Sequence, residues 1–182
     1  MGEFKLKLVR VAKIDSKYRE NTVIVKMANY AVAKRGELLS TWALGSCLAI
    51  ILYDPRTKLA SLAHSMLPEP LEAVDYPGKY VSTAIPVMID EFKKQGVKVG
   101  SLRAGIVGGA RILRFSQENG SSTTRIGLRN ARKAKMILHR LGIRIDVEDV
   151  GGTRGRNVVF NPSSGEVVVS YAGKSWLEVS HP

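Results

Sequence analysis

Two apolar runs joined by a tight-turn signal constrain the fold more than any other feature of the sequence. Residues 46–67 read SCLAIILYDPRTKLASLAHSML. Asp54 and Pro55 are residues preferred at the first and second positions of a type I turn, with Asp54–Thr57 as the four turn residues. The segment therefore predicts two neighbouring antiparallel strands, a β-hairpin.

The predicted turn also fixes a strand register. If Asp54–Thr57 is a tight turn, Tyr53 faces Lys58, and counting back along both strands places Cys47 opposite His64. Directly opposed residues have Cβ atoms about 4.5–5.5 Å apart and side chains on one face. A bulge or another turn type would shift this pairing. A thiol and an imidazole are thus expected side by side.

This pair has a plausible chemistry. A neighbouring imidazolium lowers the pKa of a thiol below its usual value of about 8.5. The thiolate then attacks a carbonyl carbon, and the same His protonates the leaving group. Gly45 and Ser46 precede Cys47, and backbone N–H groups there are candidates for holding an oxyanion. The competing interpretation is that Cys47 and His64 are ordinary core residues.

The rest of the chain predicts a mixed α/β domain with much antiparallel pairing. One helix is expected at 79–95, with Pro86 inside it, and a second at 128–141, with Leu141 among its inward residues. Further strands are expected at 22–25, 30–33, 38–44, 102–107, 143–150, 156–160 and 166–171. Residues 1–21 are read as an extension, either an added strand or a flexible arm, and residues 22–182 as the main domain.

Composition narrows the function classes. A length of 182 residues fits one domain, and a net charge of +12 favours anionic partners. No RNA- or DNA-binding signature accompanies the charge, so nucleic-acid binding is disfavoured. The chain has one cysteine, no metal-ligand spacing and no apolar run of spanning length. We therefore expect a cytoplasmic protein without cofactor, metal or membrane insertion.

Several motifs in one order resemble the CheD family, bacterial chemoreceptor glutamine deamidases. The resemblance covers roughly residues 22–178. Its motifs are Thr41–Trp42–Ala43–Leu44–Gly45–Ser46–Cys47, Tyr53–Asp54–Pro55, Ala63–His64–Ser65–Met66–Leu67–Pro68, Pro77–Gly78–Lys79–Tyr80, Gly108–Gly109–Ala110, Ile126–Gly127–Leu128–Arg129–Asn130, and Glu148–Asp149–Val150–Gly151–Gly152–Thr153–Arg154–Gly155–Arg156.

The resemblance implies a fold, an activity and partners. The implied fold is a single-domain α/β/β layered sandwich. The implied roles are nucleophile for Cys47, general base and acid for His64, and orienting residue for Thr41. The implied reaction hydrolyses glutamine side chains of methyl-accepting chemotaxis receptors to glutamate, by a monomer that also binds CheC-type phosphatases. The alternatives are a non-catalytic partner of such a phosphatase and a different Cys–His amidohydrolase.

The sequence departs from the family pattern at a few positions. Ala43 stands where a glycine is common, and Ser65 where a larger apolar residue is usual. The stretch that includes Arg111, Arg114 and residues 116–124 is longer and more polar than the family loop. These departures bear on substrate choice more than on the chemistry.

Overall fold

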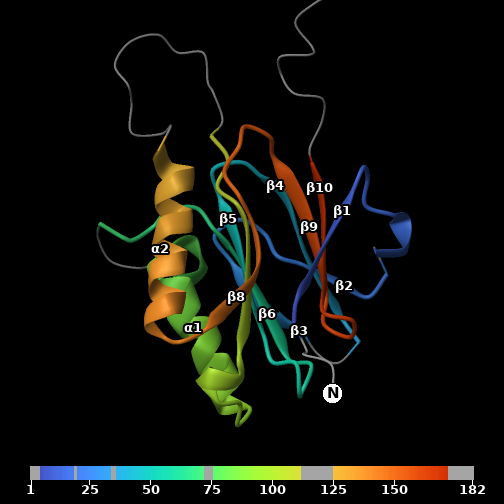
Figure 1. The fold of residues 1–182 in the computed structure, drawn as a ribbon, viewed down its shortest axis with the longest axis vertical. Coiled ribbons are helices and arrows are strands. Elements are labelled where there is room, and N and C mark those ends of the chain that lie inside the picture. Colours follow the sequence, from blue (N-terminus) through green and yellow to red (C-terminus); the bar gives the residue numbers. More distant parts are fainter. Residues whose placement is uncertain (1–4, 19, 34–35, 72–75, 112–124, 172–182) are drawn as a thin grey trace, which may run out of the picture.

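The computed structural model describes residues 5–18, 20–33, 36–71, 76–111 and 125–171. Two five-stranded sheets face each other, and two helices cover the outer face of one sheet (Figure 1). This arrangement confirms the predicted α/β/β layering. The strands are β1 (Lys7–Val11), β2 (Thr22–Ile24), β3 (Tyr30–Ala33), β4 (Leu38–Leu44), β5 (Leu48–Tyr53), β6 (Ala60–Ser65), β7 (Arg103–Gly108), β8 (Arg144–Val150), β9 (Arg156–Asn161) and β10 (Glu166–Tyr171), and the helices are α1 (Val81–Lys94) and α2 (Ile126–Arg140).

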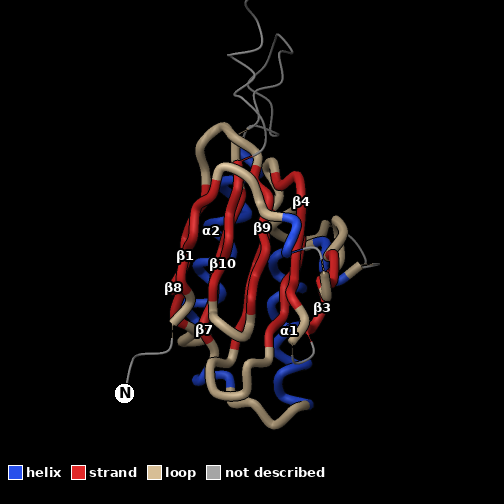
Figure 2. The backbone as a smooth tube through the Cα atoms, turned by 90° about the vertical axis from the view of Figure 1, so that its right-hand side faces the viewer, coloured by secondary structure: helices blue, strands red, loops and turns tan. Residues whose placement is uncertain are grey.

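Both sheets are mixed. The sheet between the helices and the other sheet has the order β3-β6-β5-β7-β8, and we call it the central sheet. The other, which we call the outer sheet, has the order β1-β10-β9-β4-β2 and faces the viewer in Figure 2. Parallel pairs occur at β1–β10, β2–β4 and β7–β8, and the remaining neighbours are antiparallel. The expectation of mixed, largely antiparallel sheets is therefore confirmed.

Strand β5 is buried along its whole length because it lies between two cores. Leu48, Ile50 and Leu52 pack against the helices. Ala49 and Ile51 point the other way, into the core between the sheets. Successive side chains of a strand leave on opposite faces, so a strand covered on both faces must be apolar throughout. This explains the continuous apolar run of residues 48–53.

The predicted hairpin forms, but its predicted register is wrong. His64 pairs with Ala49 and Tyr53 with Ala60, so each partner lies two positions from its predicted place. The connection is longer than the assumed turn: the N–H of Lys58 donates to Asp54 O, and Lys58 has a φ of 63°. Since side chains alternate with a period of two, a two-residue shift leaves each one on its predicted face. Cys47 and His64 are therefore diagonal rather than opposite, toward the same core.

The N-terminal segment contributes a strand to the outer sheet. Lys7–Val11 pairs in parallel with Glu166–Tyr171 of β10. Just before it, the N–H of Leu6 donates to an Asp146 oxygen at 3.1 Å, and the Leu6 side chain is buried. The division of the chain at residue 22 stays a prediction, and residues 1–4 and 19 lie outside the described ranges.

The two helices present apolar stripes to the central sheet. In α1 the buried residues recur at helical spacing, as expected of a helix in this segment, and the helix continues through Pro86. In α2, Ala131, Ala134 and Leu138 are buried. Leu141, which was expected to point inward, lies just beyond the last turn and is 40% exposed, so that prediction is wrong. Among the described residues, neither helix has the length and apolarity needed to cross a membrane.

A β-bulge interrupts β4 beside β9. The pairing shifts between Thr41 and Leu44, and Ala43 has a φ of 56°. Because of the extra residue, both Leu39 and Leu44 reach the core between the sheets although they are five positions apart. Ala43 therefore occupies a left-handed conformation that suits glycine better than alanine.

Replacing Ala43 by glycine should stabilise the protein. The left-handed conformation costs a residue with a Cβ about 1–2 kcal/mol, and the greater freedom of glycine in the unfolded chain cancels part of that gain. We expect Ala43→Gly to raise the free energy of unfolding by roughly 0.5–1 kcal/mol in urea denaturation. The matched control Ala31→Gly, in a strand position without positive φ, should lower it. A lower stability for Ala43→Gly would contradict this account.

Candidate functional site

A buried hydrogen bond joins the two sheets at the predicted site. Thr41 Oγ1 in β4 of the outer sheet lies 2.7 Å from His64 Nδ1 in β6 of the central sheet. Thr41 and His64 are both buried, with His64 only 3% exposed. Two residues that are 23 positions apart in sequence thus meet because each strand turns one face into the core between the sheets. The orienting role that the resemblance implies for Thr41 stays a prediction, and this contact is the geometry it would require.

The partners of the Thr41 hydroxyl fix the tautomer of His64. Thr41 Oγ1 also lies 2.9 Å from Val25 O, which can only accept a hydrogen bond. A hydroxyl has one proton, so Thr41 donates to Val25 and accepts from the Nδ1–H of His64. The neutral imidazole then carries its lone pair on Nε2. Nε2 is buried and has no hydrogen-bond partner among the described residues, so it is a free acceptor.

Burial rather than a charge sets the proton affinity of His64. Its pKa is lowered from 6.5 to about 4 by burial, because removing water penalises the imidazolium. The backbone is fixed as well: the N–H of His64 donates to Asn29 O at 2.9 Å, and its carbonyl accepts from Ala28 N at 3.0 Å. The side chain is therefore a neutral, well-ordered base at neutral pH.

Cys47 lies in the short connection between β4 and β5 and packs against the core between the sheets. Burial raises the pKa of its thiol. The expected lowering by a neighbouring imidazolium does not occur, since His64 is neutral at rest. At neutral pH, therefore, the thiol of Cys47 is protonated and the imidazole of His64 is neutral.

The three carbonyl groups of residues 45–47 are all held. Gly45 O accepts from Ala110 N at 2.8 Å, and Cys47 O accepts from Gly109 N at 2.7 Å. Ser46 O accepts from the side-chain amide of Asn130 at 3.0 Å. In a trans peptide the N–H points away from the preceding carbonyl, so the N–H groups of Ser46 and Cys47 are turned away from these partners. The oxyanion position predicted at Gly45 and Ser46 stays a prediction. The direction of these N–H groups is compatible with it.

The glycine pair Gly108–Gly109 at the end of β7 allows the backbone of this strand to approach Cys47. Gly108 has a φ of 116°, and a Cβ built on it would lie 2.4 Å from Cys47 O. Only glycine allows this approach, because any side chain would clash with the backbone of Cys47. The polar loop that follows, residues 112–124 with Arg114, lies outside the described residues.

Asn130 is a residue of this site that sequence reasoning missed. Its side chain is fully buried on α2 and donates to Met66 O at 2.9 Å as well as to Ser46 O. The available signal was a polar residue next to Ala131 on an otherwise apolar helix face. A buried amide at such a position needs partners of its own.

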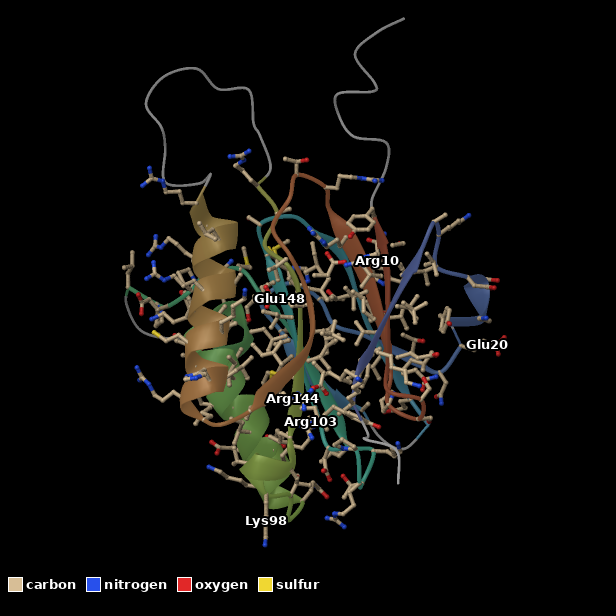
Figure 3. All side chains as sticks on the ribbon, viewed as in Figure 1. Arg10, Glu20, Lys98, Arg103, Arg144 and Glu148 are labelled. Atoms are coloured by element: carbon tan, nitrogen blue, oxygen red, sulfur yellow. The ribbon has the colours of Figure 1, made fainter. Side chains whose placement is uncertain are left out.

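A buried ion pair holds the loop behind Gly108. Arg156 Nη2 lies 3.0 Å from Asp149 Oδ1, and Arg156 Nη1 donates to Gly151 O at 2.8 Å. The N–H of Gly151 in turn donates to Gly108 O at 2.9 Å. Arg10 of β1, labelled in Figure 3, also binds Asp149, with its Nε 3.0 Å from Asp149 Oδ2. The motif at 148–156 therefore supports the backbone that contacts Cys47.

Within the described ranges, no group of three or more His, Cys, Asp or Glu side chains is placed to hold a metal ion. His139 is exposed on α2, away from the Thr41–His64 contact, and His181 is not described. The chemical resources gathered at the site are a thiol, a neutral imidazole and backbone N–H groups, which suit attack on a carbonyl carbon.

Comparisons with known proteins identify a family of similar sequences. The family model for CheD chemotactic sensory transduction matches residues 66–171. A probable chemoreceptor glutamine deamidase CheD from Desulforamulus reducens is 42% identical over 151 residues, covering 82% of this chain and 90% of that protein. A chemoreceptor glutamine deamidase CheD from Thermotoga maritima is 38% identical over 150 residues, covering 82% of this chain and 92% of that protein.

Among solved structures, YlmD from Geobacillus stearothermophilus aligns with a TM-score of 0.46 and 13% identity, covering 81% of this chain and 60% of that one.

The lowered pKa of His64 predicts an acid-sensitive fold. The unfolded chain binds a proton at His64 below pH 6.5, whereas the folded chain binds it only near pH 4. Stability from this group is therefore full above pH 6.5 and is lost as the pH falls toward 4. We expect a loss of up to about 3 kcal/mol across this window in urea denaturation. His64→Gln should show a shallower pH dependence, and equal slopes for the two proteins would contradict the assignment.

Proposed function

Because the chain belongs to the CheD family, we propose that it is a protein-glutamine deamidase that converts glutamine side chains of chemoreceptors to glutamate in chemotaxis. The proposal assigns Cys47 as nucleophile, His64 as general base and acid, and Thr41 as the residue that orients His64. The observation that carries it is the buried, unpartnered Nε2 of His64, whose tautomer is set by Thr41.

The first half-reaction releases ammonia. His64 Nε2 takes the proton from the Cys47 thiol while sulfur attacks the carboxamide carbon of the glutamine. The negative charge moves to the former carbonyl oxygen, and we assign the backbone N–H groups of the Gly45–Cys47 connection, those of Ser46 and Cys47 in particular, as its donors. The imidazolium then protonates the amide nitrogen, the C–N bond breaks, and ammonia leaves a thioester on Cys47.

The second half-reaction restores the enzyme. Water gives a proton to His64 Nε2 as its oxygen attacks the thioester carbon, and the C–S bond breaks as sulfur recovers a proton. Glutamate is the product, and Cys47 and His64 return to their neutral forms. A base whose pKa is lowered by burial to about 4 is unprotonated before each step, as both steps require.

The finer assignments belong to the same proposal. We propose that the protein acts as a cytoplasmic monomer on the cytoplasmic part of methyl-accepting receptors, without cofactor. A CheC-type phosphatase is its proposed second partner, and a Cys47→Ala protein that still binds such a phosphatase would separate binding from catalysis. A Cys–His amidohydrolase for small molecules is the competing activity, and receptor fragments as substrate distinguish the two.

Substitutions at the three residues test the chemistry. Cys47→Ala should abolish conversion of glutamine to glutamate in a purified receptor fragment, followed by peptide mass spectrometry. Thr41→Val keeps the shape of the side chain but removes the hydrogen bond to His64 Nδ1, and should lower kcat roughly 10- to 100-fold. Thr41→Ser keeps the hydroxyl and should retain most activity. Conversion by Cys47→Ala, or an equal loss in both Thr41 variants, would contradict the assigned roles.

The basic charge predicts salt-sensitive substrate capture. Helix α2 carries Arg129, Arg132, Lys133, Lys135 and Arg140 and no acidic residue in its sequence. Lys133 and Lys135 pair with Glu69 and Glu148, the latter labelled in Figure 3, and the arginines of the helix add positive charge that acts at longer range. Opposite charge on a receptor helix would raise the association rate.

We therefore expect kcat/KM on a receptor fragment to fall as salt rises from roughly 0.01 to 1 M, where the Debye length shrinks from about 30 to 3 Å. The paired variant Arg129→Gln/Arg132→Gln should have a lower kcat/KM at low salt and a flatter salt dependence. The value of kcat should change little, because long-range attraction acts before the chemical step. A kcat/KM independent of salt would rule out electrostatic capture.

A further inference from the structure

We propose that Asn130 is a positioning residue that aims the peptide N–H of Cys47 at the oxyanion, an inference that rests on the proposed deamidase activity. Asn130 touches neither sulfur nor imidazole. It acts on the peptide group that precedes Cys47, from a helix on the far side of the central sheet.

Both amide protons of Asn130 are used on the two segments that carry the catalytic pair. Asn130 Nδ2 lies 3.0 Å from Ser46 O, one residue before Cys47, and 2.9 Å from Met66 O, two residues after His64. An amide nitrogen has two protons, so these two bonds saturate it. The reversed amide would place Oδ1 against two carbonyl oxygens, so the orientation of the side chain is determined.

The bond to Ser46 O controls the N–H of Cys47. These two groups belong to one planar peptide unit and point in opposite directions. The neighbouring units are held by backbone bonds from Ala110 to Gly45 O and from Gly109 to Cys47 O. Within the described residues, Asn130 is the side chain that holds a carbonyl of this connection. Without it, the peptide between Ser46 and Cys47 can rotate, and its N–H loses its direction.

Met66 O provides the second anchor of the amide. Met66 is itself fixed, since its N–H donates to Lys79 O at 2.8 Å. The helix comes close enough because Gly127 has no side chain: a Cβ there would lie 2.4 Å from Gly109 O. Asn130 Oδ1 remains buried without a partner among the described residues. An unpaired buried acceptor is unfavourable, and an apolar side chain at this position would avoid it. The presence of an amide here therefore indicates that its two N–H donors are needed.

Three variants separate positioning from general support. Asn130→Ala removes both donors, Asn130→Asp keeps the shape but not the donors, and Asn130→Gln keeps the carboxamide one methylene further out. Loss of an oxyanion donor typically costs about 100- to 1,000-fold in kcat, so Asn130→Ala and Asn130→Asp should fall in that range with KM changed by less than about threefold. Asn130→Gln, which keeps an uncharged carboxamide, should still lose about tenfold or more in kcat because its donors are displaced.

Alkylation of Cys47 by iodoacetamide distinguishes positioning from structural support. If Asn130 only supported the fold, its variants would change the alkylation rate as well as kcat. Displacement at an alkyl carbon forms no oxyanion, and Cys47 is the only cysteine of the chain. The alkylation rate of each Asn130 variant should therefore stay close to the wild-type rate while kcat falls. Deamidation is expressed per folded molecule, with the folded fraction of each variant measured by urea denaturation, so partial unfolding does not mimic the effect.

Asn161→Ala is the matched control. Asn161 also makes a side-chain bond to a backbone group, Ser163 N, but at the opposite end of β9 from Arg156 and the site. Its kcat and alkylation rate should match the wild type. Parallel losses of kcat and alkylation in the Asn130 variants, or an unchanged kcat, would overturn the inference. Absence of Cys47-dependent conversion in the wild type would instead overturn the proposed function itself.

Discussion

Because β5 is buried on both faces, its side chains must fill two cores at once, and the positions of both sheets and both helices follow from it. The core on one side of β5 is completed by α1 and α2, and the core on the other side by β4, β9 and β10. The connection that leads into β5 carries Cys47, and the strand paired with it carries His64. The proposed nucleophile and its proposed base are therefore attached to β5 and to its neighbour β6, where the backbone has little freedom to move.

The sequence predicts most elements, and the reasons are local. The stripe of α1 and the strands at 30–33, 38–44 and 166–171 follow directly from periodicity. The hairpin register does not, because the type I signal at Asp54–Pro55 cannot reveal that Lys58 adopts a left-handed conformation and lengthens the loop. The side on which Cys47 and His64 lie was nevertheless predictable, since the error was an even number of residues.

The contacts that complete the site depend on packing between segments far apart in the chain. The bond between Thr41 and His64 needs two sheets to face each other, and the position of Thr41 depends on the bulge at Ala43. The amide of Asn130 reaches Ser46 only because glycines at 108, 109 and 127 let three backbones approach. The spacing of residues in the sequence contains none of this information. The resemblance to a known family did indicate that Thr41, Cys47 and His64 belong to one site.

The environment of Cys47 also bears on how the protein survives oxidising conditions. Peroxides attack thiolates and leave protonated thiols largely untouched. Since burial raises the pKa of Cys47 and the neighbouring imidazole is uncharged at rest, little thiolate is present between turnovers. In the proposed mechanism, sulfur becomes strongly nucleophilic only while a substrate is being attacked. The single cysteine of the chain is then protected from oxidation between turnovers.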